Sequence, residues 1–278
     1  MKIIRSLSEM KDLRQELRGT VALVPTLGGL HNGHIFHLKV AKKQSDVLIA
    51  SIFLNPLQFS ATEDLNSYPI DEKKDLKIFK ENGVDIAFLP DTIEMYGKGI
   101  STIVNPGKIA KVSEGKYRPG HFNGVATVVV KLFNLIQPHI ATFGQKDAQQ
   151  LQIIKNINQD LSLNVKIIEI PTIRDENGLA LSTRNQYLNK AERKSACEIY
   201  KSLKIAEKLV NNKEINTNII TKNVRDFLNL NNLISIEYLD IVNPTTFTTI
   251  DILDKKNLLV IAVHIGKARL IDNIILNT

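Results

Sequence analysis

The sequence has almost none of the residues that build disulfides, metal clusters or membrane spans. Its 278 residues include one cysteine, Cys197, and no tryptophan. A single cysteine excludes an intramolecular disulfide and a cysteine metal cluster, so we expect no metal site of that kind. No apolar run approaches the roughly 20 residues that a membrane-spanning helix needs, and the first residues contain no apolar signal-peptide segment. We therefore expect a cytoplasmic protein without a membrane partner.

Three common catalytic or phosphate-binding motifs are also missing. The sequence contains no GxxxxGK[ST] loop, no GxGxxG turn and no GxSxG elbow. A triphosphate would have to be held in another way, and the attacking nucleophile is expected to be a substrate group.

The net charge of +7 admits three explanations. A lysine-rich genome composition, attraction of anionic small substrates, and nucleic-acid binding would each produce it. Because the basic residues are scattered and no RNA-binding motif occurs, the sequence argues against nucleic acid as a partner.

Short apolar segments alternate with helical patterns through the first two-thirds of the chain. The strand candidates are 20–24, 47–54, 85–89, 139–143 and 164–169, and the helix candidates are 33–44, 71–82, 122–136 and 146–158. This alternation predicts an α/β domain with a Rossmann-like parallel sheet over residues 1–175. In such sheets, ligands gather at the carboxyl ends of the strands.

The pattern changes near residue 175. Helical patterns at about 190–211 and 216–228 are followed by strand candidates at 236–242, 257–263 and 268–275. Helices followed by strands predict a smaller α+β domain over residues 176–278.

The most informative stretch runs from Val24 to His34, where a strand turns into a helix. The first N–H groups of a helix are unpaired and its dipole is positive there, which suits a phosphate. Gly28 and Gly29 allow the backbone to approach a ligand, and His31 and His34 point to one side of the starting helix. His37 lies one turn further on, but nothing glycine-rich surrounds it, so it is interpreted as incidental.

Asn55 and Gln58 follow the second long strand candidate, next to Pro56. Their amides would hydrogen-bond the hydroxyl and carboxylate groups of a small polar ligand. Turn formation by Asn-Pro explains them equally well, and both interpretations stay open.

A second glycine-containing turn, from Gly144 to Gln150, follows the strand candidate 139–143 and opens a helix. Lys146 would reach the β- or γ-phosphate, and Asp147 would orient the lysine or a magnesium-bound water. Gln150 lies one turn later and would face the same ligand.

Two further segments carry suitable groups. Ser182, Thr183 and Arg184 offer two hydroxyls and a guanidinium to phosphate oxygens, or form a turn at the domain boundary. The basic loop 116–124 is either a wall of the site, with Arg118 or His121 touching substrate, or a purely structural loop.

Five blocks of the sequence together resemble the pantothenate synthetase (pantoate–β-alanine ligase) family. They are VPTLGGLHNGH, FLNPLQF, YRPGHFNGVATVV, FGQKDAQQ and IRDENGLALSTRN, in the family's order and with its separations. The HxGH motif alone is shared by a wider group of nucleotidyltransferases. The resemblance implies that pantoate attacks Mg-ATP to give pantoyl-adenylate and pyrophosphate. β-Alanine then forms the amide and releases AMP. It also implies a homodimer built through the N-terminal domain, with the C-terminal domain as a lid.

The resemblance also assigns roles to individual residues. It implies catalytic roles for His34, His31, Lys146 and Arg184, with His34 in the family's proton-donor position. The implied ATP-binding residues are Leu27, Gly28, Gly29, Leu30, His31, Asn32, Gly33, His34, Gly144, Gln145, Lys146, Asp147, Ile173, Leu181, Ser182, Thr183 and Arg184. The implied substrate-binding residues are Asn55, Gln58 and Gln150.

The chain departs from the family pattern at four positions. Leu27 and Leu181 stand where the family often has Met, which keeps the apolar bulk. Asn32 stands where an acidic residue is frequent. Gly29 stands where Ala is usual, and we expect it to loosen the turn.

Two other functions compete with the ligase. One is an HxGH nucleotidyltransferase that joins AMP to a phosphate acceptor. The other is a basic RNA-binding protein with a degenerate nucleotide fold, which steeply salt-dependent binding without ATP turnover would reveal.

Overall fold

The structure is a computed structural model that describes residues 1–61 and 63–278. Its helices are α1 (Leu7–Glu16), α2 (Asn32–Lys42), α3 (Glu72–Glu81), α4 (Thr92–Tyr96), α5 (Glu114–Tyr117), α6 (His121–Ile136), α7 (Ala148–Asp160), α8 (Lys190–Asn211) and α9 (Thr217–Leu228). Short 3-10 helices are η1 (Pro56–Gln58), η2 (Leu65–Ser67), η3 (Gly107–Lys111), η4 (Gln145–Asp147) and η5 (Thr183–Tyr187). In this described part of the chain, no helix is both long and apolar enough to cross a bilayer.

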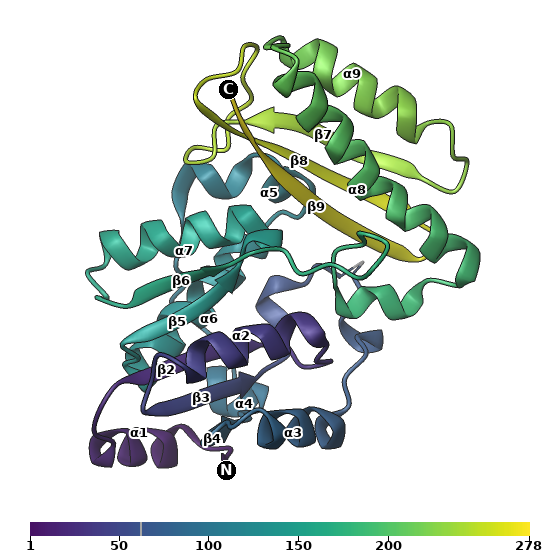
Figure 1. The fold of residues 1–278 in the computed structure, drawn as a ribbon. Helices are drawn as coiled ribbons and strands as arrows, with labels where there is room; N and C mark the ends of the chain where they lie inside the picture. The colour runs from purple at the N-terminus through teal and green to yellow at the C-terminus, as the bar shows by residue number, and fades with distance from the viewer. Residues whose placement is uncertain (62) are drawn as a thin grey trace.

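A parallel sheet of six strands forms the N-terminal unit (Figure 1). Its strands are β1 (Lys2–Ile4), β2 (Val21–Thr26), β3 (Val47–Ile52), β4 (Ile86–Phe88), β5 (Ile140–Gly144) and β6 (Lys166–Ile170), in the order β1-β4-β3-β2-β5-β6. From β2 the chain adds β3 and then β4 on one side of the sheet, whereas β5 and then β6 are added on the other side of β2. The strand order therefore reverses between β2 and β5, which is where ligands bind in open α/β sheets.

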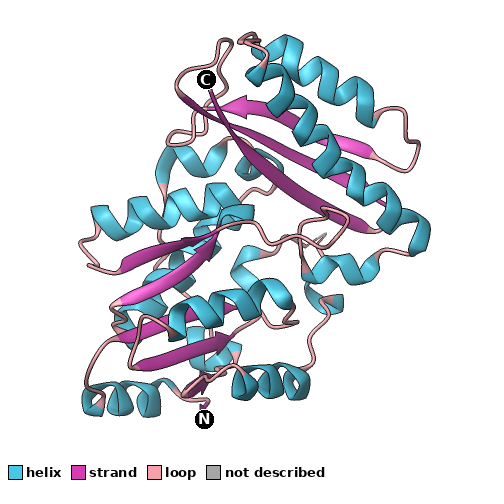
Figure 2. Ribbon diagram, viewed as in Figure 1, coloured by secondary structure: helices cyan, strands magenta, loops and turns pink. Residues whose placement is uncertain are grey.

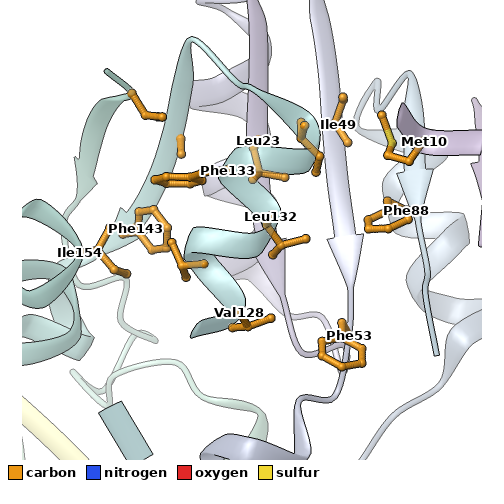
Figure 3. Packing of buried hydrophobic residues seen from close by; sticks show 14 of the residues in the cluster. Met10, Leu23, Ile49, Phe53, Phe88, Val128, Leu132, Phe133, Phe143 and Ile154 are labelled. Atoms are coloured by element: carbon orange, nitrogen blue, oxygen red, sulfur yellow. The ribbon is translucent and has the colours of Figure 1, made fainter. Parts of the chain in front are cut away.

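The two faces of this sheet bury separate sets of side chains, because alternate residues of a strand point to opposite faces. Val21 and Leu23 of β2 join a cluster with α1, α4, α6 and α7, whereas Ala22 and Val24 join a cluster with α2 and α3. Figure 3 shows the first cluster, with Leu132 and Phe133 of α6 lying among side chains of the strands. Helices therefore cover both faces, as predicted.

An antiparallel sheet of three strands forms the C-terminal unit (Figure 2). Its strands β7 (Ser235–Val242), β8 (Lys256–Ile265) and β9 (Ala268–Asn277) lie in chain order. Leu259 and Ile261 of β8 pack with α8 and α9. Leu258 and Val260 pack instead against residues of η3, α6 and α7 of the N-terminal unit. The sheet is therefore buried on both faces and joins the two units through an apolar contact.

The predicted fold class is confirmed. The five strands predicted for the parallel sheet are present, and the three later strand candidates form an antiparallel sheet. The prediction omitted β1, α1, α4 and α5. Strand β1 has only three residues. In α1, Leu7, Met10 and Leu13 recur every three residues and face the core, a short helical pattern that the prediction missed. The boundary at residue 175 stays a prediction.

Candidate active site

A cleft with a volume of about 250 Å³ opens at the carboxyl ends of β2 and β5. The predicted residues that line it are Leu27, His31, Gly33, His34, Gln58, Gly144, Lys146, Asp147, Gln150, Ile173, Leu181, Ser182, Thr183 and Arg184. The predicted residues that do not line it are Gly28, Gly29, Leu30, Asn32, Asn55 and Gln145. The cleft therefore brings together the turn after β2, the turn after β5 and the segment before α8.

The turn after β2 is held by a carboxylate that the sequence analysis missed. Asp75 of α3 is fully buried, and its two oxygens accept the N–H groups of Gly29 and Leu30, both at 2.8 Å. Thr183 donates its hydroxyl to the carbonyl of Gly29 at 3.0 Å. Gly29 therefore does not loosen the turn as expected, because hydrogen bonds fix it on both sides.

Gly29 is also required by its surroundings. Its φ is +67°, a left-handed conformation that favours glycine. An added Cβ would lie 2.4 Å from the carbonyl oxygen of Pro69 and 2.5 Å from Cγ2 of Thr183. The alanine usual in the family would therefore require a shift of these neighbours in this chain.

His31 and His34 form the N-terminus of α2, with their ring centroids 4.1 Å apart. Nδ1 of His31 accepts the N–H of Gly33 at 3.1 Å, and Nδ1 of His34 accepts the N–H of His31 at 3.2 Å. A nitrogen that accepts a hydrogen bond carries no proton, so each neutral ring carries its proton on Nε2. Both imidazoles are therefore oriented to donate from Nε2 to a ligand in the cleft.

The environment keeps both rings neutral. Burial, reinforced by the nearby charge of Lys146, lowers the pKa of His31 to about 4. Burial and the neighbouring His31 lower the pKa of His34 well below its ordinary value. Burial therefore favours the neutral form of both rings, which can donate hydrogen bonds from Nε2. The proton-donor role that the resemblance implied for His34 stays a prediction.

The ring of His31 explains why the residue before His34 is a glycine. An added Cβ at Gly33 would lie 2.7 Å from Cε1 and 2.9 Å from Nδ1 of His31. The ring of His31 therefore occupies the space that any larger side chain would need, and the HxGH spacing follows from this packing.

His37, which was interpreted as incidental, also lines the cleft. Its Nδ1 lies 3.0 Å from the hydroxyl of Thr142 on β5, and burial lowers its pKa to about 4. It lies one turn after His34 on α2, and its Nε2 would be 3.4 Å from a Cβ added at Gly144. The ring of His37 therefore lies against the backbone of Gly144, at a separation that leaves ordinary van der Waals contact even for an added Cβ.

Lys146 follows β5 in the short helix η4. Its ammonium lies 3.7 Å from the carboxylate of Asp147. Two other cations line the described part of the cleft, Arg118 and Arg184, and both are in closer ion pairs. With Asp147 as the one carboxylate in this lining, the cleft is electropositive and suits a polyanion.

Arg184 is held by Asp64. The guanidinium donates to both carboxylate oxygens at 2.9 and 2.6 Å, and the hydroxyl of Tyr187 also donates to Asp64 at 3.0 Å. Burial alone would raise the pKa of Asp64, but the hydrogen bonds and charge of Arg184 lower it overall. The carboxylate is therefore ionised and neutralises Arg184 in this state.

Asn55 supports the site without lining it. Its amide nitrogen donates to Oε1 of Gln58 and to the carbonyl of Gly124, both at 3.1 Å. Its oxygen accepts the hydroxyl of Tyr96 at 2.8 Å and the N–H of Leu57 at 3.2 Å. These contacts occupy the amide, so Asn55 orients Gln58, which does line the cleft.

Arg118 and His121 both line the cleft, which places the basic loop as a wall of the site. His121 Nδ1 lies 2.8 Å from the carbonyl of Gln58, so it carries the proton, and Nε2 accepts from Arg118 at 3.1 Å. Burial and the charge of Arg118 lower the pKa of His121 to about 4. Arg118 also donates to Glu63 at 2.5 Å.

The comparisons with known proteins agree with this geometry. The family model for pantoate–β-alanine ligase matches residues 2–275. The chain belongs to the pantoate–β-alanine ligase family.

The pantothenate synthetase of Thermoanaerobacter sp. (strain X514) is 46% identical over 278 residues, covering 99% of this chain and 98% of that protein. The crystal structure of pantothenate synthetase from Thermus thermophilus has a TM-score of 0.93 at 37% identity, with 99% of both chains covered. The pantoate–β-alanine ligase of Francisella tularensis, complexed with Beta-gamma ATP and Beta-alanine, has a TM-score of 0.83 at 34% identity, covering 99% of this chain and 97% of that one. These relatives support the ligase over the phosphate-accepting nucleotidyltransferase and over an RNA-binding protein.

The pantoate–β-alanine ligase site has little capacity to hold a metal by itself. No group of three or more His, Cys, Asp or Glu side chains among the described residues is arranged to bind a metal ion. Asp147 is half-exposed at the cleft and offers one carboxylate. The residues therefore fit a Mg²⁺ that takes most of its ligands from phosphate and water, not a protein-bound metal centre.

Besides Asp64, which holds Arg184, the residues that escaped the sequence analysis include Asp75, His37 and Ser51. Asp75 lies among the charges of α3 and has no local motif. His37 has the helical spacing that would have identified it. Ser51 of β3 lines the cleft, and its buried hydroxyl has no hydrogen-bond partner among the described residues.

Proposed function

We propose that this chain joins pantoate to β-alanine at the expense of ATP, and that both steps take place in the cleft between β2 and β5. Family membership supplies the reaction class, a ligase that forms an amide bond. The ligands named for the Francisella structure support ATP and β-alanine as substrates.

One observation carries the proposal for the site. The Nε2–H groups of His31 and His34, at the N-terminus of α2, share an electropositive cleft with Lys146. Neutral donors and a fixed cation stabilise charge that develops on phosphoryl oxygens, and they do so without a proton transfer.

In the first step, a carboxylate oxygen of pantoate attacks the α-phosphorus of ATP. The bond from that phosphorus to the bridging oxygen breaks, pyrophosphate leaves, and pantoyl-adenylate remains. We assign His31 and His34 to the phosphoryl oxygens, with Lys146 and Arg184 at the leaving pyrophosphate. Arg184 would exchange its bond to Asp64 for one to phosphate, since both acceptors suit its two-pronged geometry.

The apolar wall of the cleft suits pantoate. Val125, Val128, Val129 and Leu132 of α6 line the cleft and offer a surface for the two methyl groups of the hydroxy acid. Gln58 and Gln150 would bind its hydroxyl and carboxylate oxygens. Holding the carboxylate in line with the phosphorus would supply a large part of the rate acceleration.

In the second step, the amine of β-alanine attacks the acyl carbon of pantoyl-adenylate. The C–N bond forms, the bond from carbon to the phosphate oxygen breaks, and AMP leaves with that oxygen. The amine releases its proton to solvent. Exclusion of water from the cleft would protect the acyl-adenylate until the amine arrives.

We propose that ATP arrives with Mg²⁺. The ion would neutralise phosphate charge, and Asp147 would hold its water ligands beside Lys146. The remaining predicted ATP contacts at Ile173, Leu181 and Ser182 line the same cleft and would bind the rest of the nucleotide.

We also propose a homodimer built through the N-terminal unit, a C-terminal unit from residue 176 that closes over the nucleotide, and a cytoplasmic location. The family resemblance supports these three proposals. Light scattering of the purified protein measures its mass, and about one chain mass in place of two would exclude the dimer.

The experiment that tests the proposed reaction follows the carboxylate oxygen. Pantoate labelled with ¹⁸O in its carboxylate is incubated with ATP and β-alanine, and the AMP is analysed by mass spectrometry. Attack on the α-phosphorus places one labelled oxygen in AMP. Formation of ADP, or of AMP without label, would exclude the acyl-adenylate route.

A further inference from the structure

Asn273 on β9 of the C-terminal unit contacts the loop that carries Lys146. Its amide nitrogen donates to the backbone carbonyls of Gln145 and Lys146, both at 2.9 Å. Its amide oxygen accepts the side-chain amide of Gln145 at 3.1 Å. The residue is 5% exposed and pairs with Val260 in the sheet. All three bonds cross from the second sheet to the first unit.

An asparagine is energetically unfavourable at this buried strand position unless its side chain is hydrogen-bonded. Asn has a low strand propensity, and a buried amide without partners costs free energy. Leu270, Ile271, Ile274 and Ile275 around it are apolar, and the neighbouring buried Asp272 is itself paired with Arg174. The bonds to the 145–146 loop therefore account for a polar residue that the sheet itself does not need.

The loop has little other support at this point. Gly144 has no side chain to cap η4, and Asp147 makes no capping bond to the start of α7. Next to Asn273, Asp272 accepts two hydrogen bonds from Arg174, at 2.5 and 2.9 Å. Two consecutive residues of β9 thus hold the segments that follow β5 and β6, and both segments line the cleft.

We propose that Asn273 is a positioning residue for adenylate formation, which fixes the backbone of Gln145 and Lys146 so that the lysine ammonium lies at the transferring phosphates. This inference rests on the proposed function of Lys146. Because the bonds come from the C-terminal unit, the lysine is in place only while that unit is docked.

The test compares Asn273→Ala and the isosteric Asn273→Asp with Asn257→Ala. Asn257 is a matched control, since it is buried in the same sheet and also donates to backbone carbonyls, those of Asp254 and Leu276, away from the cleft. Full-length variants are assayed for pantoate-dependent exchange of pyrophosphate into ATP, and their thermal unfolding is followed by circular dichroism.

We expect both Asn273 variants to lower kcat of the exchange roughly 10- to 100-fold, because small misplacements of a catalytic group cost that much. The KM for pantoate should stay within about twofold. Asn257→Ala should lower the melting temperature while the folded enzyme keeps its kcat.

A double-mutant cycle shows whether Asn273 acts through Lys146. Adding Asn273→Ala to Lys146→Ala should lower kcat by less than about twofold, since coupled residues are not additive. The inference is wrong if the full loss recurs in that background, or if the Asn273 variants keep the kcat of Asn257→Ala. Absence of exchange in the unmodified enzyme would instead contradict the proposed function.

Discussion

The guanidinium of Arg269 on β9 donates to both carboxylate oxygens of Glu114 on α5, at 2.7 and 2.8 Å. Tyr238 of β7 donates its hydroxyl to the same carboxylate at 2.8 Å, and Glu237 accepts from the other side of Arg269. This buried ion pair joins α5 of the N-terminal unit to the C-terminal sheet, next to the apolar contact between the units. The C-terminal unit is therefore docked by charge as well as by apolar burial.

Glu114 should make stability depend on acid pH. Burial alone would raise its pKa, but the hydrogen bonds and charge of Arg269 lower the pKa to about 2. Its contribution is present above the ordinary carboxyl pKa of about 4.5 and is lost as the pH falls from there towards 2. Glu114→Gln should remove about 3 kcal/mol of unfolding free energy at pH 7, measured by urea denaturation. Equal stability of the two proteins at pH 7 would show that the ion pair does not hold the units together.

The cleft histidines should remain neutral across the physiological range. Because the folded pKa of His31 is about 4, below the ordinary value of about 6.5, protons bind preferentially to the unfolded chain as the pH falls below 6.5. We expect the ring C–H shifts of His31 and His34 in the free enzyme to stay constant from pH 8 to about pH 5. An NMR titration checks this, and a transition near pH 6.5 for either ring would make them charged groups at the phosphate.

Two substitutions of His34 test whether its ring acts by donating a hydrogen bond from Nε2. His34→Ala should slow the first half-reaction roughly 100-fold or more, because a donor to the transition state is lost. His34→Gln, which offers an N–H at nearly the position of Nε2, should retain more activity than the alanine variant. If glutamine were no better than alanine, donation from Nε2 would not be the function of His34.

Asp75 should control ATP use through the turn after β2. In Asp75→Asn, one carboxylate oxygen becomes an NH₂ group that faces a backbone N–H of Gly29 or Leu30. Loss of such a charged, buried hydrogen bond costs about 1.5–3 kcal/mol, so kcat/KM for ATP should fall by roughly one to two orders of magnitude.

Asp71→Ala is the matched control for this change. Asp71 caps the same helix, accepting the N–H of Lys74 at 3.0 Å, but it is exposed and does not touch the turn. It should lose about 1 kcal/mol of stability and keep kcat/KM for ATP. An equal loss of kcat/KM in both variants would mean that ATP use depends on the stability of α3 and not on the carboxylate of Asp75.

The sequence was sufficient to predict the elements whose apolar residues follow a clear pattern along the chain. Strand β2 alternates residues between two buried faces, and α8 begins at the cap that Asn189 provides and ends near the predicted residue 211. Strand β1 was not predicted because its three residues gain their burial only by pairing with β4, which is more than 80 residues away. Local pattern carries no information about such a partner.

The candidate site divides in the same way. His31 and Lys146 stand in turns whose glycines and position after strands are visible in the sequence. Asn55 was assigned to substrate, yet its contacts with Gln58, Gly124 and Tyr96 are set by tertiary packing. Asp75 and Asn273 contact turns that lie far from them in the sequence, so no local motif around either residue indicates its role.

Exchange of labelled pyrophosphate into ATP by the unmodified enzyme and by Lys146→Ala tests the central claim most directly. The account predicts exchange that requires pantoate and not β-alanine, AMP release that requires β-alanine, and a loss of exchange of roughly 100- to 1,000-fold in the folded variant. Exchange without pantoate, or near-normal exchange by Lys146→Ala, would contradict it.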